Sequence, residues 1–152
     1  MLLAAGAGVD AAAHHGFTAL IGASIDGRVE VVRMLLAAGA GVDAAANNGF
    51  TALISASIDG RVEVARALLA AGAGVDAADG DSWTALICAS YFGRVEVLRA
   101  LLAAGANKHI ITNNGISTAY TLASHNGFTT PPRQWRSARS STSRPDGGPD
   151  AL

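Results

Sequence analysis

Residues 49–78 read GFTALISASIDGRVEVARALLAAGAGVDAA, and much of the chain is a variation on this stretch. The string LLAAGA begins at residues 2, 35, 68 and 101, so the pattern returns every 33 residues. A fixed period of this length is typical of stacked supersecondary units, each of which buries its apolar face only against a neighbour. The period therefore predicts a repeat protein built from such units.

Composition narrows the class of protein further. The 152 residues carry a net charge of −1, 50% of them are hydrophobic, and aromatic residues make up 5%. This near-neutral charge gives little attraction to nucleic acids or acidic membranes, so neither is expected as a partner. No apolar run approaches the ~18 residues that span a bilayer. The single cysteine, Cys88, excludes an intrachain disulfide and fits a reducing compartment, so we expect a cytoplasmic protein, with the nucleus also open.

The unit from residue 13 to residue 45 shows how each repeat should fold. Thr18 can cap a short first helix through its hydroxyl, and Gly27 allows the turn that ends this helix. A second helix is expected from about residue 28 up to the stop at Gly39. The inner face of this second helix is expected to carry an apolar stripe of Val31, Val32, Leu35 and Leu36.

The repeat boundaries divide the chain into three parts. Residues 1–12 match the truncated end of an upstream repeat, and residues 13–127 form the repeat array. The array comprises complete repeats at 13–45, 46–78 and 79–111 and a partial repeat at 112–127. Residues 128–152 are rich in Ser, Pro, Arg and Gly and lack apolar periodicity, so this tail is predicted to be disordered.

The repeated motifs resemble those of the ankyrin-repeat family. These motifs are Gly-x-Thr-Ala-Leu, Ala-Ser-x-x-Gly-Arg-Val-Glu-Val and Leu-Leu-Ala-Ala-Gly-Ala-Gly-Val-Asp. The resemblance covers residues 1–127 and implies an all-α fold, an α-solenoid of helix-turn-helix repeats joined by β-turn loops. It also implies a concave groove, formed by the turn tips and the first helices, in which partner proteins dock.

Two departures from the family pattern concern the loops. The family has Thr-Pro-Leu-His at the first helix, whereas this chain has Thr-Ala-Leu-Ile in each complete repeat. The family also favours an Asp that rigidifies the turn. Ala13 and Ala46 replace that residue here, and Asp79 restores it once. We therefore expect loops that are held less firmly than the family pattern implies.

Differences between the repeats indicate where a partner binds. Positions that stay fixed serve stacking, whereas positions that change are free to contact a partner. The changes fall at the turn tips and on the first helices, and the third repeat introduces Trp83, Tyr91 and Phe92 as expected aromatic anchors. Drift after a recent duplication is the alternative explanation. The predicted protein-binding residues are His14, His15, Phe17, Ile25, Asp26, Asn47, Asn48, Phe50, Ser55, Ile58, Asp59, Asp81, Trp83, Cys88, Tyr91 and Phe92.

No residue pattern indicates catalysis or cofactor binding. His14 and His15 are adjacent, which rarely allows two ligands to bind one metal ion, and no Cys or carboxylate recurs at ligand spacing. Cys88 stands where the other repeats have Gly22 and Ser55, which fits a small helix residue better than an activated thiol. The recurring Gly-Ala-Gly-Val-Asp lacks the Lys-Ser/Thr of a phosphate-binding loop. We therefore expect no enzyme activity, cofactor, metal or small-molecule substrate.

These observations predict a non-catalytic interaction module, expected to be a monomer, that binds a partner protein through the concave groove of the repeat stack. The alternative from another class is a substrate-targeting fragment of a larger enzyme, such as a kinase or a ubiquitin ligase, whose catalytic domain lies outside this chain. A gene remnant without function is a third interpretation.

Overall fold

The computed structural model describes residues 8–113, apart from the side chain of His14. The predicted disordered tail at 128–152, nearly all of the partial repeat at 112–127 and the start of the segment at 1–12 lie outside the described residues.

Three helix pairs follow one another along the described chain. They are α1 (Ala19–Asp26) with α2 (Val29–Ala37), α3 (Ala52–Asp59) with α4 (Val62–Ala70), and α5 (Ala85–Tyr91) with α6 (Val95–Ala103). A short 3-10 turn, η2 (His14–Gly16), precedes them, and one isolated β-bridge joins Ala78 to Thr84. Residues 8–113 contain no strand, and the predicted all-α solenoid of helix-turn-helix repeats is confirmed.

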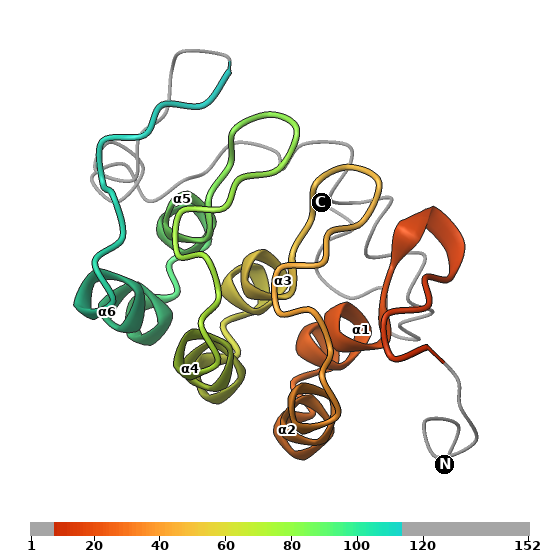
Figure 1. The fold of residues 1–152 in the computed structure, drawn as a ribbon. Coiled ribbons are helices and arrows are strands. Elements are labelled where there is room, and N and C mark those ends of the chain that lie inside the picture. Colours follow the sequence, from red (N-terminus) through yellow and green to blue (C-terminus); the bar gives the residue numbers. More distant parts are fainter. Residues whose placement is uncertain (1–7, 114–152) are drawn as a thin grey trace.

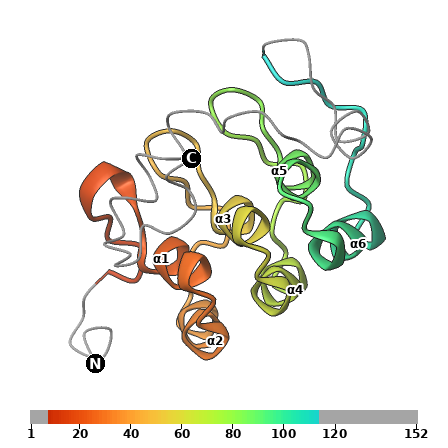
Figure 2. The same cartoon turned by 180° about the vertical axis from the view of Figure 1, so that it is seen from behind.

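The helices form two rows, as both views of the ribbon show (Figures 1 and 2). The first helices of the repeats, α1, α3 and α5, make the inner row, and the second helices, α2, α4 and α6, make the outer row. Each helix packs against the other helix of its own repeat and against the equivalent helix of the adjacent repeat. The loops between the pairs extend beyond the inner row, on the side away from the outer row (Figure 1).

Each inner helix begins at a capping threonine and packs through small residues. The hydroxyl of Thr18 accepts a hydrogen bond from the Ile21 N–H at 3.2 Å, and Thr51 and Thr84 cap α3 and α5 in the same way. The predicted threonine cap is thus confirmed. Alanines between the inner helices are fully buried, and their short side chains let the helices approach closely. These alanines are Ala52, Ala56, Ala85 and Ala89.

The outer helix α4 lies between two other described outer helices, α2 and α6, and packs against both. Val64 and Val97 are each 1% exposed and face the preceding repeat, whereas Val31 at the same repeat position in α2 is 40% exposed. The prediction that Val31 belongs to the buried stripe is therefore wrong. The physical reason is that residues 8–18 provide no outer helix ahead of α2 to cover this side chain.

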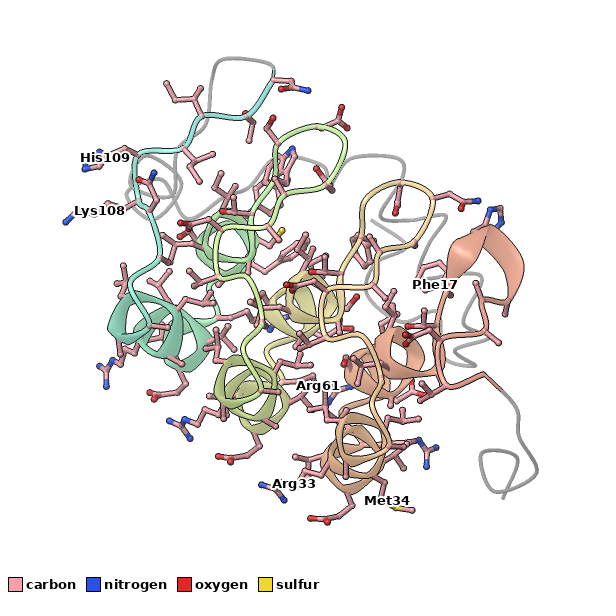
Figure 3. All side chains as sticks on the ribbon, in the orientation of Figure 1. Phe17, Arg33, Met34, Arg61, Lys108 and His109 are labelled. Atoms are coloured by element: carbon pink, nitrogen blue, oxygen red, sulfur yellow. The ribbon has the colours of Figure 1, made fainter. Side chains whose placement is uncertain are left out.

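An arginine from each following repeat reaches back to the inner helix of the repeat before it. The Arg61 Nε donates a hydrogen bond to the Ile25 carbonyl at 3.1 Å, and the Arg94 Nε donates to the Ile58 carbonyl at 2.9 Å. Figure 3 shows Arg61 among the helices, whereas Arg33 extends outward from α2. These arginines satisfy carbonyls at the C-terminal ends of α1 and α3, which the helices themselves leave without an intrahelical partner.

A glycine makes room for each of these arginines. Gly27 and Gly60 both have φ of 72°, and a Cβ on them would lie 2.8 Å and 2.9 Å from the Cδ of Arg61 and Arg94. The left-handed backbone and the close side chain both disfavour any other residue. Each arginine therefore packs beside the glycine of the preceding repeat, and the two residues together join neighbouring repeats.

A second ladder runs along the loops that follow the outer helices. The Asp10 carboxylate accepts hydrogen bonds from the Gly41 N–H at 2.9 and 3.1 Å, and Asp43 does the same with Gly74. Asp76 accepts one hydrogen bond, at 2.8 Å, from the N–H of Asn107 in the next repeat. The Gly-Val-Asp motif thus links each repeat to the next one through an acceptor and a backbone donor.

Replacing Arg61 by methionine should lower the free energy of unfolding by about 1–2 kcal/mol, because a charge-assisted hydrogen bond is lost and the Ile25 carbonyl loses its donor. Urea unfolding followed by circular dichroism measures the change. Arg28→Met is the matched control, since Arg28 holds the same repeat position but is exposed and pairs with Asp26 at 3.8 Å. Equal losses in the two variants would contradict the role assigned to Arg61.

Candidate protein-binding surface

The turn tips are tied to one another by their backbones. In each pair of neighbouring repeats, a carbonyl of the earlier tip accepts a hydrogen bond from an N–H of the later tip. The acceptors are the carbonyls of His15, Asn48 and Asp81, and their donors are the N–H groups of Asn47, Gly80 and Asn113, at 2.9, 2.9 and 3.0 Å. The tips therefore form a row whose register is set by backbone hydrogen bonds.

In the third tip, a carboxylate accepts backbone hydrogen bonds from within the same turn. The Asp79 carboxylate accepts from the N–H groups of Asp81 at 2.9 Å and Trp83 at 3.0 Å. The expectation that Asp79 rigidifies its turn is confirmed. In the second repeat, where Ala46 replaces this residue, the Asn48 side chain instead accepts from the Phe50 N–H at 3.1 Å.

One tip position requires a left-handed backbone in every repeat. Gly16 and Gly49 adopt φ of 78° and 86° there, and Ser82 adopts 67° in the third repeat. A Cβ on Gly49 would lie 2.9 Å from the Asp79 Cα, so the next tip packs directly against it. The Ser82 hydroxyl donates to the Asn113 side-chain oxygen at 2.6 Å, which offsets part of the strain.

The predicted binding residues divide by exposure. Seven of them lie in the core, and the prediction that these seven present a surface to a partner does not fit their burial. They are Ile25, Phe50, Ser55, Ile58, Trp83, Cys88 and Tyr91. Five of the seven lie on inner helices that pack against neighbouring repeats, and Phe50 and Trp83 directly precede the capping threonines and join the same core. A residue that varies at these positions still fills the core.

The two largest expected anchors illustrate this correction. Trp83 and Tyr91 are each 5% exposed, and their rings meet edge to face with centroids 5.6 Å apart. Phe92 packs on Tyr91 at 5.0 Å but is only half-buried, and the Arg94 guanidinium lies 6.0 Å from its ring centroid. Phe92 is thus the one expected anchor of the third repeat that retains an accessible ring.

The remaining predicted residues keep part of their surface exposed, except for His14. Four are exposed, namely His15, Asp26, Asn47 and Asp81. Four are half-buried, namely Phe17, Asn48, Asp59 and Phe92. His14 lies in η2, and its side chain is not among those described. The accessible set is therefore concentrated at the turn tips and at the C-terminal ends of the inner helices.

Two tip residues were missed by the sequence comparison. Ser82 and Asn113 are joined by their side chains, and the Asn113 amide also donates to the Gly80 carbonyl at 3.1 Å. The signal that could have found Ser82 is its position, because both earlier repeats place glycine there. Asn113 falls at the repeat position of Asn47, which the comparison of complete repeats did not reach.

Cys88 is fully buried on α5, and burial raises the pKa of its thiol well above the usual value, with the negative charge of Asp79 adding to the effect. Burial and the raised pKa fit a core side chain, because a protonated thiol is a poor nucleophile. Within residues 8–113, no cluster of His, Cys, Asp or Glu side chains is arranged to bind a metal ion. No helix in the same range is long and apolar enough to cross a membrane.

The fold and the tip row define a helical repeat solenoid that presents a line of loops. A family model described as ankyrin repeats (3 copies) matches the chain at residues 1–79 and again at 39–113. The chain belongs to the ankyrin-repeat family, which confirms the resemblance seen in its motifs. Ankyrin repeats generally act in protein–protein interactions and are typically non-catalytic. A comparison with curated proteins gave no match.

Alanine at Gly49 should destabilise the protein more than alanine at Gly39. Both glycines have a left-handed backbone, with φ of 86° and 92°, so each variant should lose about 1 kcal/mol to strain. Gly49→Ala should lose about 1–3 kcal/mol more because its methyl group meets the Asp79 backbone, whereas no described atom lies within 4 Å at Gly39. Urea midpoints measure both losses, and equal midpoints would show that the tips do not pack as described.

Raising the pH should weaken the native protein through Cys88. Its thiol ionises in the unfolded chain near the usual value of about 8.5 but not in the folded protein, so stability is lost as the pH rises through that value. The urea midpoint of the native sequence should therefore fall more between neutral pH and pH 9.5 than that of Cys88→Ala. An identical fall in the two proteins would mean that the thiol ionises equally well in both states.

Proposed function

We propose that this chain is a non-catalytic interaction module that binds a partner protein along the row of turn tips and the concave side of the inner helices. The observation that carries the proposal is the backbone ladder of the tips, which holds chemically different side chains at matched positions. A rigid frame with variable side chains provides selectivity with little ordering cost on binding.

The chemistry of the tips changes from one repeat to the next. The matched pairs are His14-His15, Asn47-Asn48 and Gly80-Asp81, so the row runs from imidazoles through amides to a carboxylate. By contrast, the Asp10, Asp43 and Asp76 ladder keeps the same acceptor throughout. At the tips, the residues that vary lie beside the backbone hydrogen bonds that join the repeats, so the side chains can change while these bonds are kept. This supports selective recognition of one partner.

Half-buried rings supply apolar contact area beside these polar tips. Phe17 meets Phe50 edge to face at 6.3 Å, and Phe92 stands where the other repeats have Asp26 and Asp59. A partner that covers Phe92 would gain an apolar contact that the first two repeats do not offer at this position.

We also place this activity inside the cell, in the cytoplasm, because the only cysteine of the chain is a buried free thiol.

A photoreactive amino acid at Asn47 should crosslink a discrete partner in extracts of the source cells, whereas the same group at Ala70 should not. Asn47 is exposed at a tip, and Ala70 is exposed at the end of the outer helix α4, so both are accessible. Mass spectrometry identifies the crosslinked species. An excess of unlabelled native chain should abolish the product, and Asp81→Arg should compete less well. Equal crosslinking from both positions would contradict the tip surface.

A further inference from the structure

The second turn tip contains an asparagine followed directly by a glycine, at Asn48 and Gly49. The equivalent positions of the other two complete repeats carry His-Gly and Asp-Ser, so this dipeptide belongs to the second tip alone among them. Both residues are half-buried, so part of each is in contact with water. Figures 1 and 2 show their loop, between α2 and α3, beside the loop between α4 and α5.

An Asn-Gly pair is chemically reactive in water, because glycine has no side chain to keep its nitrogen away from the asparagine carboxamide. In this reaction the peptide nitrogen of the glycine loses its proton and forms a bond to the asparagine Cγ. The Cγ–Nδ2 bond breaks, and Nδ2 takes up a proton and leaves as ammonia. Water then opens the cyclic imide at either carbonyl. One product is aspartate, and the other is isoaspartate, in which the main chain runs through the side-chain carbons.

The fold engages both groups of this pair that would react. The Gly49 N–H donates a hydrogen bond to the Ala46 carbonyl at 2.9 Å, and a proton held in this way is lost less readily. The Asn48 side-chain oxygen accepts a hydrogen bond from the Phe50 N–H at 3.1 Å, which holds the carboxamide by its oxygen. The closed tip therefore slows cyclisation at both the nitrogen and the carbon that must meet.

The main chain of the same pair links the second tip to the third. The Asn48 carbonyl accepts a hydrogen bond from the Gly80 N–H at 2.9 Å, and a Cβ on Gly49 would lie 2.9 Å from the Asp79 Cα. The first tip is hydrogen-bonded to the second tip as well. The second tip is therefore held from both sides, and the pair can cyclise only when this tip opens locally.

We propose that Asn48 is a site of spontaneous deamidation that the closed tip protects, and that its isoaspartate product disconnects the second tip from the third. Water is the co-reactant, and ammonia is the leaving group. In the isoaspartate form, the carbonyl carbon that faced Gly80 belongs to a charged carboxylate branch, and the main chain between residues 48 and 49 gains one carbon. The register of the tip ladder is then lost at this step.

The two products differ in their effect on the stack. Aspartate keeps the main chain and a side-chain oxygen that can accept from the Phe50 N–H, so it leaves the tip ladder intact. Isoaspartate lengthens the main chain beside Gly49, where even one added atom would lie 2.9 Å from the Asp79 Cα. Destabilisation should therefore follow from isoaspartate and not from the new charge. Neither the reaction nor its effect depends on the binding of a partner.

The first test compares deamidation of the full chain when folded and when unfolded in guanidinium chloride, both at mildly alkaline pH. Mass spectrometry of the tryptic peptide 34–61 follows Asn48, and Asn47 in the same peptide is the control because no glycine follows it. In the unfolded chain, Asn48 should react faster than Asn47 and at a rate similar to the Asn-Gly pairs at 114–115 and 126–127. In the folded protein, the rate at Asn48 should fall about tenfold or more, because only the open fraction reacts.

A matched pair of variants tests whether the third tip keeps the second one closed. Gly80→Pro removes the N–H that binds the Asn48 carbonyl. Gly80→Ala keeps this N–H, and its Cβ would lie at an ordinary 3.4 Å from the same carbonyl oxygen. Deamidation of the folded protein should be faster in the proline variant and close to the native rate in the alanine variant. Circular dichroism checks that both are folded, and the comparison of folded and unfolded native chain decides if the proline variant is not.

The last test concerns the isoaspartate product. A chain aged in guanidinium chloride is refolded and fractionated by ion exchange, and peptide mapping selects the fraction that carries isoaspartate at position 48 alone. Asn48→Asp is the control, since it has the same charge and an unaltered main chain. The isoaspartate form should unfold at a lower urea concentration than this control, and its Gly80 N–H should exchange with deuterium faster.

Three outcomes would overturn the proposal. The first is an Asn48 that deamidates equally fast in the folded and the unfolded chain, and the second is an unfolded chain in which Asn48 reacts no faster than Asn47. The third is an isoaspartate form whose urea midpoint and Gly80 exchange match those of Asn48→Asp.

Discussion

The contact between neighbouring repeats is the interaction on which the rest of this structure depends. The outer helices have nine residues each and the inner ones seven or eight, and helices this short are not stable by themselves in water. Each becomes stable only when adjacent repeats cover its apolar faces. Arg61 and Arg94 add hydrogen bonds to that contact. Each comes from the repeat that follows and donates to a carbonyl near the C-terminal end of α1 or α3.

The same contact separates residues that hold the stack from residues that are free to recognise a partner. Any side chain between two inner helices is constrained from both sides, whether its identity varies or not. The tips escape this constraint because their register is set by backbone hydrogen bonds, which tolerate any side chain. The glycine position of the tips is the exception, since Gly49 packs against the Asp79 backbone. Stacking therefore constrains the tip side chains less than the core side chains, which supports the proposed tip surface.

Much of the fold could be predicted from the sequence, because a 33-residue period, capping threonines and glycine stops are local signals. The surface was harder to predict, since variation between repeats does not reveal burial. Tyr91 replaces the isoleucines of earlier repeats, an exchange of one large apolar side chain for another that keeps the core filled. Phe92 replaces aspartates and so changes the surface instead. The fact that a position varies therefore does not show whether it lies in the core or on the surface. The chemical type of the replacement residue distinguishes the two here.

Exposure at the ends could not be derived from a repeat motif at all. Arg28 and Arg61 are the same residue type in nearly identical local sequence, yet one is exposed and the other lies between helices. What differs is the neighbour, which a single motif does not encode. Because residues 8–18 contain no outer helix ahead of α2, Val31 and Arg28 are exposed there although their residue types are the same as in the later repeats.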